Sequence, residues 1–151
     1  MIDARDRMHG GALMQIVKHP SFASLNNVES TRNKYGHYVL NGDVRILMKY
    51  SSNKNGRWGF TFRDDDLRHL AADMSNTPKK PVFLVLICDD KICTLDRGKI
   101  NDLLDTSKPG QQVINVLKPG KRALMRVTSK LRGAPFMVPD SDFPAKLLAH
   151  S

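Results

Sequence analysis

The side chains that most often carry enzymatic chemistry are scattered along this sequence. Its five histidines, at positions 9, 19, 37, 69 and 150, include no i, i+4 pair that would bind a metal ion, and no Cys-x-x-Cys motif is present. A G-x-S-x-G elbow, a Walker loop and a G-x-G-x-x-G motif are also absent. No two acids have a spacing typical of general acid–base catalysis. We therefore expect no metal site and no cofactor, and we interpret His37 as an ordinary sheet residue.

Two other groups of reactive side chains have a structural interpretation. Residues 64–66 are three aspartates in front of an apolar stripe. Acids in the first turn of a helix complement its dipole and one of them can cap it, which explains the cluster without a metal. Cys88 and Cys93 become direct cross-strand neighbours if Asp90-Lys91 forms a two-residue turn. They could form a redox pair, but two buried thiols that pack in a sheet are the more common arrangement.

The element that positions most of the remaining polar residues is a hairpin at residues 35–52. Asn41-Gly42 between two alternating runs is typical of a type I′ turn, because both residues tolerate positive φ. A two-residue turn pairs Leu40 with Asp43 and places Lys34 opposite Lys49. The second strand then has an apolar face toward the core and a mixed, basic face on its other side.

Hydrophobic periodicity and turn residues predict the other elements. We expect a helix at residues 8–25 that ends or kinks at Pro20, a loop at 26–33, a strand at 57–63, a helix that begins at 64–66, a buried strand at 82–88, a strand at 92–95, a short helix at 100–104, a hairpin of 111–117 with 121–127, and a short helix at 143–148. These elements predict one α/β (α+β) domain over residues 1–151. A central mixed sheet with hairpins occupies about residues 35–127, a few helices flank it, and residues 128–151 form a tail.

Composition and charge narrow the classes of partner. The chain of 151 residues has a net charge of +9, with 40% apolar and 26% charged residues. No apolar run approaches the roughly 20 residues that span a bilayer, so we expect no membrane partner. The first residues lack the hydrophobic core of a signal peptide, and two cysteines fit a reducing compartment. These features predict a cytoplasmic protein of a bacterial or phage type.

The positive charge is concentrated near the end of the chain. Residues 111–151 carry seven cations and two acids, whereas residues 81–110 carry four cations and five acids. A local basic surface suits a polyanion, because cations that contact phosphates release the counterions bound there. The alternative is that the protein is basic for solubility alone, as many small bacterial proteins are.

A family resemblance enters at residues 44–52, Val-Arg-Ile-Leu-Met-Lys-Tyr-Ser-Ser. This segment resembles the central strand of the PD-(D/E)xK, restriction-endonuclease-like superfamily. In that family a strand ends in acid-x-Lys followed by small polar residues, and an aspartate stands at the start of a neighbouring strand. The loop, aromatic strand, helix and buried strand that follow fit the same pattern, which covers about residues 12–104. The resemblance implies a restriction-endonuclease-like fold and contact with nucleic acid.

The sequence departs from the family at the position that would bind the metal. Leu47 stands where the family has the acid two residues before the lysine, here Lys49. Asp43 lies about 20 Å from Lys49 at roughly 3.3 Å per strand residue, and Lys34 opposite Lys49 would repel Mg²⁺. Glu29 adds one carboxylate. We therefore expect no cleavage; a metal-dependent nuclease would have to use Glu29, Asp43 and Lys49.

The prediction from the sequence is a non-catalytic, nuclease-like domain that binds DNA or RNA through a basic face. Lys34, Arg45 and Lys49 would line the former cleft. Backbone phosphates would be contacted by Lys118, Lys121, Arg122, Arg126, Lys130 and Arg132. The alternative is an accessory or inhibitory module that binds an acidic protein partner. A homodimer would partly provide the cover that the buried strand at residues 82–88 needs on both faces.

Overall fold

The computed structural model describes residues 1–28, 36–52, 55–75, 79–121 and 124–149. These residues form one α+β domain with nine strands and four α-helices. In chain order the elements are α1 (Ala4–Val17), β1 (Leu25–Asn27), β2 (His37–Leu40), β3 (Val44–Ser51), β4 (Arg57–Phe62), α2 (Asp64–Met74), β5 (Val82–Cys88), β6 (Lys91–Leu95), α3 (Arg97–Leu103), β7 (Gln112–Leu117), β8 (Met125–Ser129), β9 (Phe136–Val138), the 3₁₀ helix η2 (Asp140–Asp142) and α4 (Ala145–Leu148).

The central sheet has five strands in the order β1-β2-β3-β5-β6. It is mixed, as the sequence predicts: β3 and β5 run parallel, and the other neighbours are antiparallel. A parallel pair needs a crossover, and here β4 and α2 supply it. Every residue of β5 is buried, which confirms the prediction of a strand covered on both faces.

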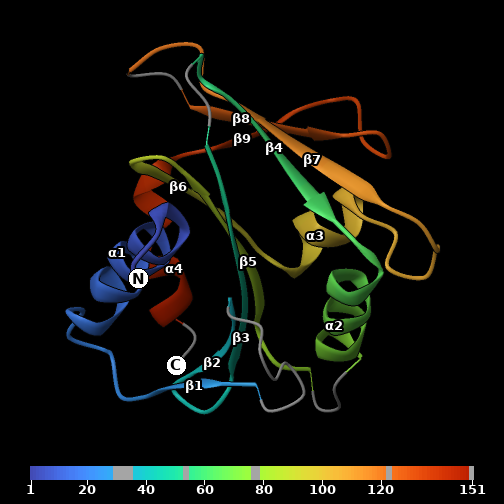
Figure 1. The fold of residues 1–151 in the computed structure, drawn as a ribbon. Helices are drawn as coiled ribbons and strands as arrows, with labels where there is room; N and C mark the ends of the chain where they lie inside the picture. The colour runs from blue at the N-terminus through green and yellow to red at the C-terminus, as the bar shows by residue number, and fades with distance from the viewer. Residues whose placement is uncertain (29–35, 53–54, 76–78, 122–123, 150–151) are drawn as a thin grey trace.

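Two apolar layers cover the central sheet. On one side α1 and α4 pack against it, with Ile16 and Leu147 buried beside Ile46. On the other side lie α2, α3 and a second sheet, and Leu47 belongs to that layer of the core. Figure 1 shows the central sheet between these two groups of elements. None of the helices in the described part of the chain is long and apolar enough to cross a membrane.

The second sheet, which we call the outer sheet, corrects the expectation of one sheet at residues 35–127. It has four strands in the order β4-β7-β8-β9, and β9 lies in the predicted tail. The period-two pattern of β4 is confirmed, since Trp58, Phe60 and Phe62 are all buried. These rings pack in the core between the two sheets. The backbone of β4 forms its hydrogen bonds with β7 and does not extend the central sheet. The predicted hairpin of residues 111–117 and 121–127 is present as β7 and β8, with the second strand shifted to Met125–Ser129.

The register of the central hairpin differs from the prediction by one residue. Leu40 pairs with Val44, so the turn contains three residues, Asn41, Gly42 and Asp43. Asn41 and Gly42 have the positive φ values that their types predict, at 51° and 80°. The Asn41 side chain also accepts hydrogen bonds from the backbone N–H groups of residues 23 and 24 and donates one to the oxygen of residue 21. This contact ties the turn to a distant segment, which a pattern within the hairpin does not report.

The first helix begins and ends earlier than predicted. Asp3 caps it and forms a capping box with Asp6, so α1 starts at Ala4, and the helix ends at Val17, before Pro20. Part of the expected loop at residues 26–33 is instead strand β1, whereas residues 29–33 lie outside the described part of the chain. The short helices near residues 100–104 and 143–148 are present with shifted bounds.

The two cysteines are not direct cross-strand neighbours. The turn between β5 and β6 is Asp89-Asp90, so Cys93 pairs with Leu86 and Cys88 pairs with Lys91. Both thiols are free and buried. Burial raises the pKa of Cys88 strongly and that of Cys93 to about 12, so both stay protonated near neutral pH. The structure therefore supports packing, rather than redox pairing, as their role.

One buried histidine makes the stability of this fold depend on pH. Burial, with a smaller contribution from the charge of Arg5, lowers the pKa of His9 from 6.5 to about 4. The unfolded chain therefore binds this proton at a higher pH than the folded chain does. Stability should be full above about pH 6.5 and fall by up to about 3 kcal/mol as the pH approaches 4. Urea unfolding across this range should show a shallower decline in His9→Gln than in the natural chain; equal declines would contradict the assignment.

Candidate functional site

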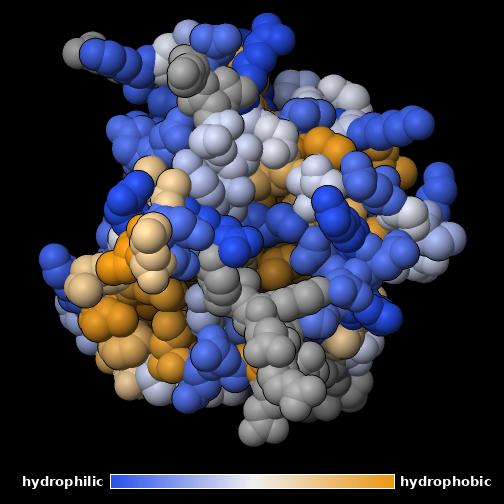
Figure 2. Space-filling view, in the orientation of Figure 1, coloured by the Kyte–Doolittle hydropathy of each residue, from blue (hydrophilic) through white to orange (hydrophobic). Residues whose placement is uncertain are grey.

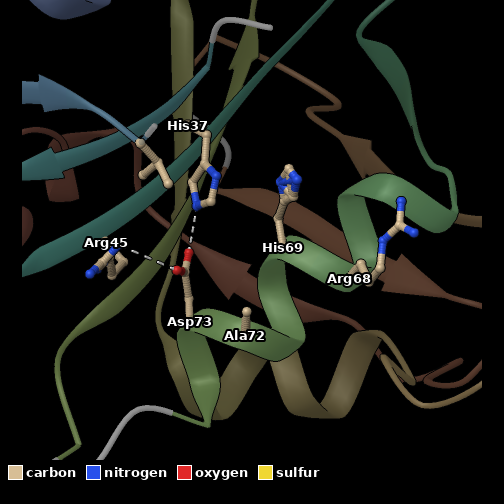
Figure 3. Close-up of a pocket in the computed structure, with 7 residues that line it drawn as sticks. His37, Arg45, Arg68, His69, Ala72 and Asp73 are labelled. Carbon is tan, nitrogen blue, oxygen red and sulfur yellow. Dashed lines mark hydrogen bonds and ion pairs between the residues drawn. The ribbon is translucent and has the colours of Figure 1, made fainter. Parts of the chain in front are cut away.

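A cavity of about 320 Å³ opens where β2, β3 and α2 meet. Figure 3 shows its lining side chains, which come from segments far apart in the sequence. They are Val28, His37, Arg45, Arg68, His69, Ala72 and Asp73. Within the described part of the chain, one acid, two arginines and two histidines therefore surround this cavity.

Asp73 is the least expected of these residues. It continues the buried stripe of α2 after Leu67 and Leu70, and only 4% of its surface is exposed. A buried carboxylate is costly unless hydrogen bonds and opposite charge compensate for the loss of water. Here the His37 ring provides the bond, with 2.7 Å between its Nε2 and an Asp73 oxygen. The pair joins α2 to β2 in the interior.

Arg45 provides the opposite charge. Its Nη1 lies 3.9 Å from the other carboxylate oxygen of Asp73. The Arg45 side chain is about one quarter exposed, whereas Asp73 and His37 are both buried. Asp73 therefore has a cation on one side and an imidazole on the other, as the dashed lines in Figure 3 mark.

His69 forms the next layer of the site. It lies one helical turn before Asp73, so both side chains leave the same face of α2. Its ring stacks on His37, with 5.0 Å between the ring centroids and 28° between the planes. Arg68 extends from the helix at the rim, where it forms an exposed ion pair with Asp65. Two imidazoles thus stand in contact beside a rim arginine.

Two buried nitrogen atoms in this lining lack partners. His37 Nδ1 and Arg45 Nε have no hydrogen-bond partner among the described residues. Because the carboxylate of Asp73 holds Nε2 of His37, the opposite nitrogen is the one available to exchange a proton or bind a ligand. Across the described residues, no three His, Cys, Asp or Glu side chains come together to hold a metal ion. The arginine and histidine donors of the described lining suit an anion.

The residues of the nuclease-like motif have separate partners. Lys49 forms an ion pair of 2.8 Å with Asp66 and lies 4.9 Å from the centre of the Phe62 ring. Asp43 instead pairs with Lys80 at 3.4 Å. Lys49 therefore faces α2 and its Asp66, whereas Arg45 lines the cavity beside Asp73. Glu29 and Lys34, including the predicted pairing of Lys34 with Lys49, lie outside the described residues.

The aspartate cluster at residues 64–66 serves the start of α2, as predicted. The N-cap residue is Arg63, and its N–H donates to Asp66, which is also the partner of Lys49. Asp64 accepts a hydrogen bond from the N–H of Gly110 and so ties the helix to the loop before β7.

The predicted phosphate contacts divide between the two ends of the outer sheet. Lys118 and Lys121 lie where β7 leads toward β8, beside Trp58 around a second hollow. Figure 2 shows hydrophilic side chains over this end, at the top of the view. Lys130 and Arg132 follow the opposite end of β8, where the Arg132 guanidinium stacks 3.9 Å from the Phe136 ring. Arg126 is exposed on β8 between them, and Arg122 lies outside the described residues.

Comparison of the chain with protein-family models, with curated proteins and with solved structures finds no match. The resemblance to the PD-(D/E)xK superfamily accordingly stays a prediction. What the cavity can do follows from its own residues, namely His37, His69, Arg45, Arg68 and Asp73.

Sequence reasoning missed most of this site. It treated His37 as a sheet residue and assigned no role to His69, Arg68 or Asp73. One signal was present: after Leu67 and Leu70, the next position of an i, i+3 stripe is Asp73, where a core helix normally has an apolar residue. An acid at such a position predicts a buried partner, but the sequence does not say which one.

Proposed function

We propose that the protein binds nucleic acid through the outer face of the outer sheet. The observation that carries this proposal is a row of four side chains in register across its four strands: Arg57, Leu117, Arg126 and Met137. Arg57, Arg126 and Met137 are exposed, because alternate residues of these strands face away from the core. Two arginines therefore project from one face of the outer sheet.

The absence of acids from this sheet supports the proposal. None of its four strands contains Asp or Glu, and none occurs anywhere in residues 106–139. A surface with cations and no acids attracts phosphates without local repulsion, and contacts to phosphates position a nucleic acid without reading its bases. Leu117, between the two arginines, offers an apolar contact to a base or a sugar.

We extend the proposal to a restriction-endonuclease-like core without cleavage. After the central strand β3, the aromatic strand, the helix and the buried strand of the resemblance follow in the expected order as β4, α2 and β5. A carboxylate at position 47 would be buried in the core, where Leu47 packs now. Lys49 already has Asp66 as its partner. These features favour binding over metal-dependent hydrolysis.

A second candidate function is binding of an acidic protein partner. Large apolar side chains are exposed around the same sheet, including Met137 at 46% and Leu131 at 58%. Apolar anchors beside arginines are common in protein interfaces. The affinity for such a protein would fall less with added salt than the affinity for a nucleic acid, because burial of apolar side chains also contributes to it.

Charge reversal on the outer face should weaken nucleic-acid binding. Arg57→Glu with Arg126→Glu should reduce the affinity for a labelled oligonucleotide by about 10-fold or more and lower the salt slope by about 1 to 2. Fluorescence anisotropy with single- and double-stranded DNA and RNA across a salt series measures both quantities. The matched control is Arg7→Glu with Lys18→Glu, which removes the same charge from exposed positions at α1.

The two double variants separate the candidate functions. Equal losses of affinity in both variants would mean that net charge alone drives binding, and would contradict a site on the outer face. Failure of the natural chain to bind any of the four probes at low salt would overturn the nucleic-acid proposal and leave the acidic protein partner.

A further inference from the structure

We propose that the cavity between β2, β3 and α2 binds a phosphate group. This site goes beyond the proposed function, because it uses other residues on another part of the molecule. Its lining is the set already described around the His37–Asp73 pair. Its volume of about 320 Å³ is at the lower end for small-molecule pockets, which suits a phosphate or a small phosphate ester.

The unpartnered nitrogen of His37 is the first reason. A buried polar atom without a partner is rare in native proteins and commonly marks a missing ligand or water. His37 Nδ1 is such an atom among the described residues, on a ring that lines the cavity and is 4% exposed. In Figure 3 this nitrogen is on the side of the ring nearer to His69. A phosphate oxygen there would accept a hydrogen bond from it when both ring nitrogens carry a proton.

The charge of the lining is the second reason. Among the described residues, Asp73 is the single acid that lines the cavity, and Arg45 and His37 both contact it. When His37 carries both ring protons, the Asp73 carboxylate stabilises the charged ring from its far side, and Nδ1 becomes a donor. His69 and Arg68 add further positive or polar groups at the open side. In the part of the chain that the structure describes, the lining therefore has more hydrogen-bond donors than acceptors, as an anion site requires.

The shape of the donor set favours phosphate over a carboxylate. The donors that line the cavity come from three different elements, β2, β3 and α2. A tetrahedral phosphate has oxygens in several directions and up to two negative charges, whereas a carboxylate presents two oxygens in one plane with one charge. Arginine and histidine together are suited to the former.

Imidazole nitrogen NMR of the full chain tests this proposal. Inorganic phosphate should shift the ring ¹⁵N signals of His37 and His69 in a saturable way, with a Kd of about 1 mM or below. His69→Gln and Arg68→Gln should each weaken this binding by about 5-fold or more, and both positions tolerate change because they are not buried. Arg7→Gln, at an exposed site on α1, is the matched control and should leave the Kd unchanged.

Further ligands define the source of the phosphate. A nucleoside 5′-monophosphate that binds more tightly than inorganic phosphate would identify a phosphate ester as the ligand, and equal affinity would identify free phosphate. Acetate that binds as well as phosphate would overturn the choice of phosphate. Absence of a saturable shift, or equal losses in Arg68→Gln and Arg7→Gln, would overturn the site itself. The Arg57→Glu, Arg126→Glu variant should still bind phosphate in the cavity. The two proposals are therefore tested separately, and failure of one does not imply failure of the other.

Discussion

Asp73→Ala should lower the free energy of unfolding by about 3 kcal/mol, because it leaves a buried hydrogen-bonding group without its partner. The substitution removes the acceptor that lies 2.7 Å from His37 Nε2 and the nearest carboxylate to Arg45, at 3.9 Å. It leaves a buried imidazole without a partner on either nitrogen among the described residues, and a hole in the contact between α2 and β2. Urea unfolding at neutral pH measures the change.

Asp65→Ala is the control for the Asp73 variant. Asp65 also lies on α2 and also forms an ion pair, with Arg68, but both side chains are exposed to solvent. Its removal should cost about 0.5 kcal/mol, as is usual for surface pairs. Similar costs for the two variants would mean that the buried pair does not hold α2 against the sheet.

A double substitution tests whether the His37–Asp73 pair contributes mainly to stability or to ligand binding. Replacement of a buried ion pair by apolar residues of similar volume is often neutral or stabilising. Asp73→Leu with His37→Leu should therefore recover most of the stability that Asp73→Ala loses, while phosphate binding disappears. That combination would show that the pair serves the ligand more than the fold. Loss of stability equal to the single variant would assign it a mainly structural role.

Local patterns allowed the elements with the strongest periodicity to be predicted. Alternation in β4 and the continuous apolar run of β5 depend on which faces of a strand are covered, and this information lies within the strand itself. The first-turn acids of α2 are equally local, because a helix dipole acts within one turn. These predictions are confirmed.

Long-range contacts decided what could not be predicted. Whether β4 extends the central sheet or begins another depends on its pairing with β7, some 50 residues later. The three-residue turn of the hairpin is tied to a distant segment by hydrogen bonds between the Asn41 side chain and residues 21, 23 and 24. The site depends on His37 and Asp73, 36 residues apart, which meet only after α2 folds back over the sheet. In each case the sequence shows one unusual residue, but it does not show which distant residue will contact it.

Gly36→Ala should be among the most destabilising single substitutions in the described chain, at about 3–4 kcal/mol, from positive-φ strain together with a steric clash. Gly36 has φ of +104°, and an added Cβ would stand 2.5 Å from the backbone oxygen of Met48. That contact cannot relax through a side chain, because the oxygen belongs to the backbone. The backbone is also held in place here, since the Met48 N–H donates a hydrogen bond to the Gly36 oxygen at 2.6 Å. Thermal or urea unfolding measures the loss.

Substitutions at two other glycines distinguish the steric clash at Gly36 from the strain of its positive φ. Gly42→Ala shares a positive φ, +80°, but meets nothing within 4 Å, so it should cost only about 1–2 kcal/mol. Gly10→Ala lies within α1 with open space around it and should stabilise the protein by about 0.5–1 kcal/mol. Because Gly36 directly precedes His37, its variant should also weaken phosphate binding, whereas the other two should not. If Gly36→Ala lowered the free energy of unfolding no more than Gly42→Ala does, β3 would not approach residue 36 closely. The placement of His37 against Asp73 would then be contradicted as well.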